Sequence, residues 1–290
     1  MFQNFVMYRT YSIKNMKPSI FFRKKDKDIN LCLSGGGALG FAHIGVIQAL
    51  EENGIYATRI SGTSMGAVIG AFYASGFSPE YMLKLIKEDK LYKVSTLLTL
   101  HSNFWKRGLS DHTTLRKLIK ELIPHNSFEG LEKKFCVCVS NMNKATWEMI
   151  DSGKELDKWV AASASIPGIF EPIKINGSIY MDGGVMNNMP AQCFEQNFKT
   201  TIGVDVIPYT RLTLPDMLKT SNAAFTSIRA MQHQNSREGR DICNFLIEPL
   251  VLNKYHEFSF ENYQEIYQIG YEAAIQYINK QRDISNLIKK

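Results

Sequence analysis

Short apolar runs alternate with stretches of helical periodicity along most of the chain. Residues 29–33 are nearly all apolar, which is typical of a strand buried on both faces. Apolar side chains then recur at helical spacing over 39–50, and Gly54 supplies a stop. A short strand at 59–61 and a helix that ends near Gly76 repeat this order. The pattern predicts successive strand–helix units.

The alternation continues to the end of the chain. Ser78 followed by Pro79 predicts a helix start, because serine is a favoured N-cap and proline fits the first helical position. The other expected elements are helices over 113–122, 214–238 and 260–282, strands over 135–140, 146–150, 201–206 and 244–247, and a hairpin of 173–175 with 179–181. Strands that alternate with helices favour a mostly parallel sheet covered on both faces.

Composition and charge narrow the class of protein. The chain has 290 residues, enough to bury a substantial core, and its sequence contains no apolar run long enough for a membrane-spanning helix. Its net charge of +6 is concentrated in residues 1–28, which carry seven basic and two acidic side chains and leave +1 for residues 29–290. A nearly neutral body argues against a nucleic-acid-binding face, and we expect no nucleic-acid partner.

The basic segment 1–28 has two interpretations. It is a flexible N-terminal tail, or an arm that settles on an anionic membrane surface through its charge and its aromatic residues. Five cysteines without a framework spacing indicate a reducing compartment, so we expect a cytoplasmic protein with peripheral membrane contact as an option. Cys136 and Cys138 have no second pair nearby, which favours core residues over metal ligands. We expect no metal and no cofactor.

Gly62-Thr63-Ser64-Met65-Gly66 has the G-x-S-x-G form and lies where a short strand is expected to meet a helix. A serine at such a sharp turn exposes its hydroxyl, and small neighbours make room for the turn. The following helix directs N–H groups and the positive end of its dipole toward the serine. Ser64 is therefore a candidate nucleophile, with a simple helix-capping serine as the alternative.

The glycines at 35–37 also follow a strand, and they allow two interpretations. Their amides can turn toward the oxyanion of an acyl-transfer reaction, or Gly35, Gly37 and Gly40 form a G-x-G-x-x-G dinucleotide site. A dinucleotide site needs a carboxylate at the end of the second strand, where residues 57–62 have none. The sequence favours the oxyanion site.

Asp182-Gly183-Gly184 directly follows the hairpin strand at 179–181. An aspartate at a strand end followed by two glycines is compatible with a plain turn. Together with the other two motifs it is a candidate base for Ser64, provided that burial raises its pKa from the ordinary value near 3.9.

These three motifs, in this order, resemble the patatin-like phospholipase family. The resemblance rests on GGGALG at 35–40, GTSMG at 62–66 and DGG at 182–184, continues in ASIPGIF at 164–170, and covers most of residues 29–206. It implies a three-layer α/β/α fold and a serine acyl hydrolase that cleaves fatty-acyl esters of lipids, of phospholipase A or lysophospholipase type. It also implies the site residues: Ser64 as nucleophile, Asp182 as proton acceptor of a Ser–Asp dyad, Gly35, Gly36 and Gly37 as oxyanion hole, and Gly40, Gly62, Gly66, Gly183 and Gly184 as supporting glycines.

One position departs from the family pattern. Many members carry arginine or lysine where this chain has Leu39, so backbone amides alone would support the oxyanion. Leu39 keeps a second hypothesis open, in which the chain is a non-catalytic or weakly active lipid-binding relative.

Histidine chemistry is the competing enzyme hypothesis. His233 and His256 follow Asp182, so the chain order of a Ser-Asp-His hydrolase is present, although both histidines are expected at the surface or in caps. His43 is expected to be packed and hydrogen-bonded on the first helix, and Asp111 to start a helix.

The sequence pattern divides the chain into three parts. We expect a basic segment at 1–28, a catalytic core at 29–206 and a C-terminal helical region with one strand at 207–290. The segment 90–131 within the core is expected to be a cap or a lid over an apolar channel. The oligomeric state does not follow from the sequence.

Overall fold

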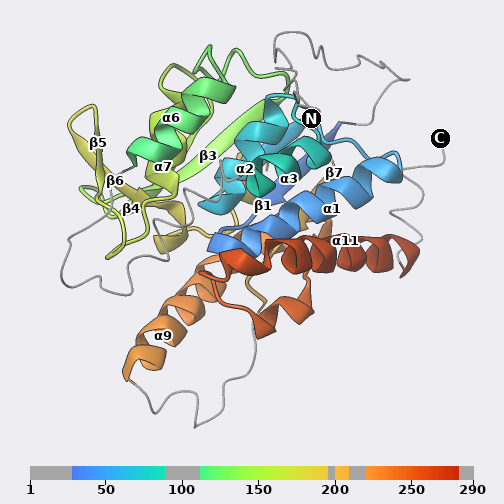
Figure 1. Ribbon diagram of the computed structural model, residues 1–290. Helices are drawn as coiled ribbons and strands as arrows, with labels where there is room; N and C mark the ends of the chain where they lie inside the picture. Colours follow the sequence, from blue (N-terminus) through green and yellow to red (C-terminus); the bar gives the residue numbers. More distant parts are fainter. Residues whose placement is uncertain (1–27, 89–111, 195–199, 209–219, 281–290) are drawn as a thin grey trace, which may run out of the picture.

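The computed structural model describes residues 28–88, 112–194, 200–208 and 220–280 (Figure 1). Eight strands in this part of the chain form one sheet, in which hydrogen-bonded neighbours run β5-β6-β3-β2-β1-β7-β8 and β4 pairs with β3. The strands are β1 (Ile29–Leu33), β2 (Arg59–Gly62), β3 (Lys134–Asn141), β4 (Thr146–Ile150), β5 (Ile173–Ile175), β6 (Ser178–Asp182), β7 (Thr200–Val204) and β8 (Phe245–Ile247).

The sheet is mixed but mostly parallel, as predicted. β1 pairs in parallel with β2 and β7, and the parallel part extends to β3 on one side and β8 on the other. The antiparallel pairs are confined to β3 with β4, β3 with β6, and the β5–β6 hairpin. Every residue of β1 is buried, which agrees with its nearly all-apolar sequence.

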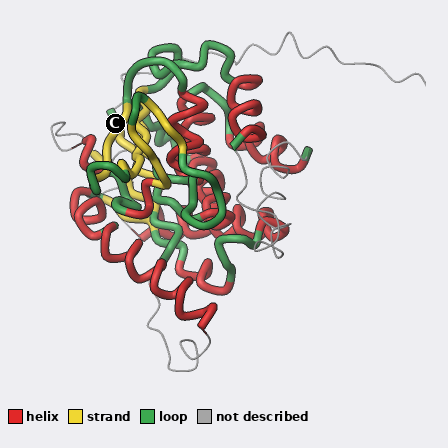
Figure 2. Tube along the Cα trace, turned by 90° about the vertical axis from the view of Figure 1, so that its left-hand side faces the viewer, coloured by secondary structure: helices red, strands yellow, loops and turns green. Residues whose placement is uncertain are grey.

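Helices flank the sheet, and in Figure 2 they lie on both sides of the strands. They are α1 (Phe41–Glu52), α2 (Met65–Ala74), α3 (Pro79–Lys87), α6 (Thr113–Leu122), α7 (Leu156–Ser163), α9 (Thr220–Asn235), α10 (Arg237–Ile242) and α11 (Tyr263–Lys280). The helix start at Ser78 is confirmed, because its side chain accepts a hydrogen bond from the Tyr81 amide at 3.2 Å.

The first and last helices pack closely on one another. A β-carbon on Gly45 of α1 would lie 2.0 Å from the carbonyl oxygen of Tyr267, and one on Gly270 of α11 would lie 2.1 Å from that of Ala42. Only glycine permits backbones to approach so closely. This contact joins the C-terminal helix to the helix that follows the glycine loop.

Several boundaries differ from the sequence prediction. Helix α7 is absent from it, and β7 ends at Val204 rather than 206. The helix expected over 214–238 is described from 220 and is divided into α9 and α10 at Ser236, while the one expected from 260 begins as a 3-10 turn, Phe260–Asn262, before α11.

Some predictions fall on residues outside the described ranges. These are the N-terminal tail up to residue 27, the first part of the cap or lid segment (89–111), and the helix start at Asp111. Among the described helices, none combines the length and the apolar character that a bilayer-spanning segment requires.

Candidate active site

Ser64 occupies the sharp turn between β2 and α2. Its backbone angles are φ 53° and ψ −125°, a region that side chains rarely adopt, and it is the N-cap residue of α2. The turn needs small neighbours: a β-carbon on Gly66 would lie 2.5 Å from the carbonyl oxygens of Leu33 and Ser34. The strain and the close approach are what a serine turn of the G-x-S-x-G type requires.

A side chain on α7 holds this turn. The Ser64 amide donates to Ser163 Oγ at 2.9 Å, and Ser163 Oγ donates to the carbonyl oxygen of Cys138 at 2.6 Å. All three residues are buried. Ser163 was missed by sequence reasoning because its helix was missed. Because the Ser64 amide is hydrogen-bonded to Ser163, it does not face a ligand.

Strand pairing explains how Asp182 reaches Ser64. β4 pairs with one edge of β3, so β2 and β6 both pair with the other edge. β2 lies along the first half of β3, and β6 lies along the second half. β2 runs parallel to β3 and ends at Gly62 opposite Val137, whereas β6 runs antiparallel and ends at Asp182 opposite Val139. The two strands therefore run toward each other, and their ends meet.

The environment of Asp182 makes it a stronger base than a free aspartate. Only 4% of the residue is exposed, and this burial raises the pKa of its carboxyl from 3.8 to about 7, against the lowering effect of hydrogen bonds from the Ser64 side chain and the Gly184 amide. The Gly184 amide donates to Asp182 Oδ1 at 2.7 Å. Burial thus brings the pKa of this carboxyl to about 7, and the Ser64 side chain lies close enough to lower it.

The glycine loop lies beside Ser64, and its amides differ in availability. The Gly35 amide donates to the Asn188 carbonyl at 3.2 Å, and the Ala38 amide donates to the Glu257 carbonyl at 2.8 Å. Within the described residues, no hydrogen bond uses the amides of Gly36 or Gly37. A β-carbon on Gly35 would lie 3.2 Å from Ser64 Cβ, so the loop is adjacent to the serine. Gly36 and Gly37 are therefore the free donors, and the Gly35 amide is engaged elsewhere.

Leu39 and His43 bring no charge to this site. Leu39 is buried in the core, and its amide donates to the Gly36 carbonyl. His43 is buried and hydrogen-bonded to the Ser34 carbonyl as expected, and burial lowers its pKa to about 4, so it is neutral at pH 7. In the described part of the chain, no hydrogen bond joins Ser64 or Asp182 to a histidine.

Two asparagines complete the surroundings of Ser64 and Asp182. Asn188 is 1% exposed, and neither Oδ1 nor Nδ2 of its side chain has a hydrogen-bond partner among the described residues. A β-carbon on Gly35 would lie 2.5 Å from Asn188 Oδ1, and one on Gly184 would lie 2.8 Å from it. The Asn235 side chain on α9 accepts a hydrogen bond from the backbone amide of Asn188 at 3.0 Å and donates one to the Gly184 carbonyl at 3.0 Å. Sequence reasoning identified neither residue, because both act through contacts distant in the chain.

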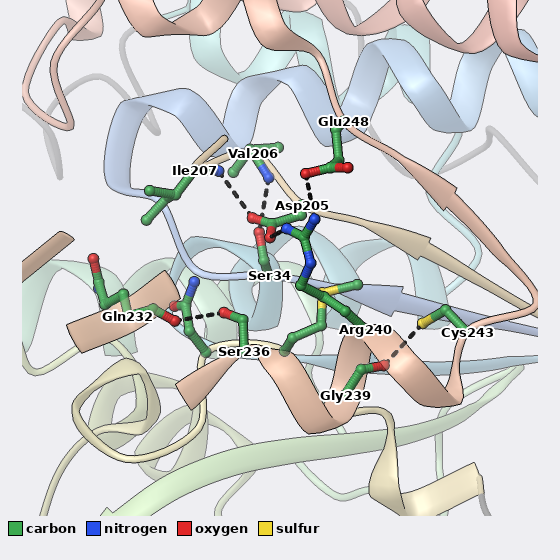
Figure 3. Close-up of polar contacts among 12 residues, drawn as sticks. Ser34, Asp205, Val206, Ile207, Gln232, Ser236, Gly239, Arg240, Cys243 and Glu248 are labelled. Atoms are coloured by element: carbon green, nitrogen blue, oxygen red, sulfur yellow. Dashed lines mark hydrogen bonds and ion pairs between the residues drawn. The ribbon is translucent and has the colours of Figure 1, made fainter. Parts of the chain in front are cut away.

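A buried polar network fixes the strand ends beneath the glycine loop (Figure 3). Ser34 Oγ accepts from the Val206 amide at 3.0 Å and donates to the Gly35 carbonyl at 3.1 Å. Asp205 pairs with Arg240 at 2.6 Å, and Arg240 also binds Glu248 at 2.6 Å. Burial raises the pKa of Asp205, and the Arg240 guanidinium opposes that effect. The first residues of the loop are thereby tied to the end of β7.

A cavity of about 490 Å³ lies elsewhere, and its lining includes Arg59 and Lys134, the first residues of β2 and β3. Ser64 comes after the last residue of β2, and Asp182 is the last residue of β6, so this cavity is separate from the Ser64–Asp182 pair. Cys136 lines it too and is buried, as is Cys138, which agrees with their expected place in the core.

Comparison with protein-family models decides the family. The model of the patatin-like phospholipase family matches residues 31–194, which include the glycine loop, Ser64 and Asp182. The chain belongs to the patatin-like phospholipase family.

Relatives and solved structures agree with this assignment. The lysophospholipase nte1 of Emericella nidulans is 26% identical over 89% of this chain, and the lysophospholipase NTE1 of Coccidioides immitis is 27% identical over 90%. This chain spans only 18% of the length of each. The crystal structure of VipD from Legionella pneumophila has a TM-score of 0.53 at 18% identity and covers 88% of this chain and 67% of its own. That likeness shows a patatin-like fold.

The family match ends at residue 194, so part of the site's surroundings lies beyond it. Asn235 of α9 and the carbonyl group of Glu257 both contact the motif loops from outside the matched region. The patatin-like core of this chain is completed by its C-terminal segment.

Proposed function

We propose that this chain is a serine acyl hydrolase that cleaves fatty-acyl esters of lipids, with Ser64 as nucleophile and Asp182 as its base. The single observation that carries the proposal is the buried Asp182 carboxyl, which lies beside the Ser64 turn where the ends of β2 and β6 meet and whose pKa burial raises to about 7. A base with such a pKa is half ionised at neutral pH and accepts a proton far more readily than a free aspartate. No histidine is needed to activate the serine.

Acylation follows from these positions. Ser64 Oγ attacks the ester carbonyl while Asp182 takes the hydroxyl proton, and the amides of Gly36 and Gly37 donate to the oxyanion that forms. Asp182 then returns the proton to the departing alcohol. Because Leu39 supplies no charge, the backbone amides and the N-terminal end of α2 carry the stabilisation.

Deacylation uses the same groups a second time. Asp182, ionised again, takes a proton from a water molecule that attacks the acyl-serine carbonyl. The glycine amides stabilise the second oxyanion, and its collapse releases the fatty acid and restores the Ser64 hydroxyl with the proton from Asp182.

Family membership supports a lipid ester as substrate, and the matched relatives are named lysophospholipases. We propose a phospholipase A or lysophospholipase activity on that basis. The competing proposal is a lipid-binding relative without turnover, favoured by Leu39 at the position where many members carry a basic residue. The five free cysteines support a reducing compartment such as the cytoplasm, with peripheral contact at a membrane that holds the substrate.

Two measurements on the full chain test the activity. A chromogenic acyl ester should be hydrolysed by the wild type, and a fluorophosphonate probe should label it at Ser64. Ser64→Ala and Asp182→Asn should lose turnover, whereas His233→Ala, His256→Ala and the control Ser152→Ala at an exposed serine should keep most of it.

Absence of both turnover and labelling would favour the lipid-binding alternative. Loss of turnover in His233→Ala or His256→Ala would instead favour a histidine-dependent hydrolase. Hydrolysis across a panel of phospholipids, lysophospholipids and neutral lipids then identifies the substrate class.

A further inference from the structure

The glycine loop is contacted by a short segment near the end of the chain, residues 255–257. The Glu257 carbonyl accepts from the Ala38 amide at 2.8 Å. The same oxygen lies against Gly37, where an added β-carbon would be 2.3 Å away. Gly37 has φ 54°, a conformation that glycine adopts without strain. One carbonyl oxygen therefore holds the Ala38 amide and packs against Gly37, which limits rotation of the Gly37 backbone and so restricts the direction of the preceding peptide, which carries the Gly37 N–H.

An ion pair holds this segment in place. Arg229 on α9 binds Glu257 through two contacts, Nε to Oε1 at 2.5 Å and Nη2 to Oε2 at 3.1 Å, and Nη2 also donates to the Tyr255 carbonyl at 3.2 Å. The side chains are 30% and 19% exposed. A two-point contact between a guanidinium group and a carboxylate fixes direction as well as distance. Arg229 thus orients the segment on both sides of residue 256.

We infer that Arg229 and Glu257 are positioning residues for the oxyanion hole. The inference rests on the proposed function, because it assigns the Gly37 amide to the oxyanion. Among the described residues, no hydrogen bond joins either side chain to Ser64 or Asp182: Arg229 binds Glu257, and the Glu257 carbonyl binds the loop. Both residues lie outside the region that matches the family model.

The charge that Arg229 brings to the Glu257 carboxylate matters as much as the geometry of the pair. Glu257 is partly buried beside a loop that receives negative charge during the reaction. With Arg229 present, the carboxylate is neutralised. Without Arg229, a second negative charge would remain near the developing oxyanion and oppose its formation. An ordinary surface ion pair makes a different prediction, since its loss changes stability slightly and leaves turnover alone.

The test compares Arg229→Met, Arg229→Lys, Glu257→Gln and the double variant in the full chain. Ser64→Ala sets the background, and Lys84→Met removes an exposed ion pair on α3 as a matched control. For each protein, kcat and KM are measured with a short-chain chromogenic ester, and Tm is recorded. Arg229→Met should lower kcat on the order of 10-fold to 100-fold with KM nearly unchanged, because a misplaced oxyanion donor weakens only the transition state. Arg229→Lys should lie between Arg229→Met and the wild type, because lysine keeps the charge but not the planar fork.

The double variant separates charge from geometry. It leaves no unpaired carboxylate, so its kcat should exceed that of Arg229→Met alone. A kcat of Arg229→Met within twofold of the wild type would overturn the inference while Ser64-dependent turnover persists. Wild-type turnover no higher than that of Ser64→Ala would overturn the proposed function as well. If Arg229→Met does not fold, Arg229→Lys decides, because it keeps the charge: a lowered kcat at constant KM supports the inference, and an unchanged kcat refutes it.

Discussion

Replacing Asp182 by asparagine should abolish turnover and yet stabilise the folded protein increasingly as the pH rises from about 4 to 8. The side chains have nearly the same shape, so packing changes little. The difference is that the asparagine cannot ionise in a site where only 4% of the residue is exposed. Asp182 should therefore show opposite effects on activity and on stability, with a pH dependence that identifies it.

The sign and size of the effect on the free energy of unfolding follow from the pKa of Asp182. Burial raises it from 3.8 to about 7, so between these pH values the folded protein binds a proton at Asp182 that the unfolded chain has released. The contribution of this group to the free energy of unfolding is fully present below pH 3.8 and is lost as the pH rises through 7. The total is about 4 kcal/mol, at roughly 1.4 kcal/mol per pKa unit.

Urea unfolding between pH 4 and pH 8 measures this difference. Near pH 4 the wild type and Asp182→Asn should have similar stability, and the variant should gain on the wild type by up to about 4 kcal/mol at pH 8. Asp241→Asn, at an exposed aspartate, is the control and should follow the wild type throughout. In the same range, wild-type kcat/KM should fall about tenfold per pH unit below pH 7, because only the ionised carboxylate accepts the Ser64 proton.

Two results would refute this reasoning. A wild-type kcat/KM that stays constant from pH 5 to pH 8 would mean that no group of pKa near 7 controls the reaction. A difference in unfolding free energy that does not grow with pH would mean that Asp182 is not desolvated in the folded protein.

Three further substitutions probe the supports of the site. Ser64→Gly should abolish turnover but raise the free energy of unfolding by about 1 kcal/mol, since glycine relieves the strain at φ 53°; a lower Tm would contradict this. Ser163→Ala leaves the buried Ser64 amide without an acceptor and should cost about 1–3 kcal/mol in urea unfolding, together with slower fluorophosphonate labelling; unchanged labelling would argue that the turn does not need Ser163. Asn235→Ala removes hydrogen bonds to Gly184, Val185 and Asn188 and should cost about 1–3 kcal/mol, and a Tm equal to that of the wild type would show that α9 does not hold the Asp182 loop.

The sequence predicted those features that depend on local chemistry. The apolar run at 29–33, the serine turn at 64 and the cap at Ser78 are read from neighbouring residues, and the structure has a strand, a sharp turn and a helix start there. Helix α7 escaped prediction although Leu156, Trp159, Val160 and Ser163 have helical spacing. It is only eight residues long and follows Glu155, whose φ of 65° and lack of a side-chain cap give no recognisable start signal.

Features that depend on tertiary contacts were beyond sequence reasoning. The three loop glycines look equivalent in the sequence, yet the Gly35 amide is engaged by a carbonyl group more than 150 positions away, at Asn188. The pKa of Asp182 depends on burial, which depends in turn on β6 pairing with the same edge of β3 as β2. A motif identifies which residues are chemically suited to a site, whereas the pairing of distant strands decides how far that site is buried from water.

In the proposed mechanism, burial lets an aspartate take the role of general base that many hydrolases assign to histidine. A histidine titrates near 6.5 in water, whereas an aspartate reaches that range only when water is removed from around it. The meeting of β2 and β6 on one edge of β3 provides such a place, with the Asp182 backbone amide bound by the Ser165 carbonyl at 3.0 Å. The same burial destabilises the ionised fold at neutral pH, so the surrounding hydrogen bonds must hold a strained serine and a desolvated carboxylate together. It follows that any change which admits water to Asp182 should stabilise the ionised protein and weaken its base at the same time.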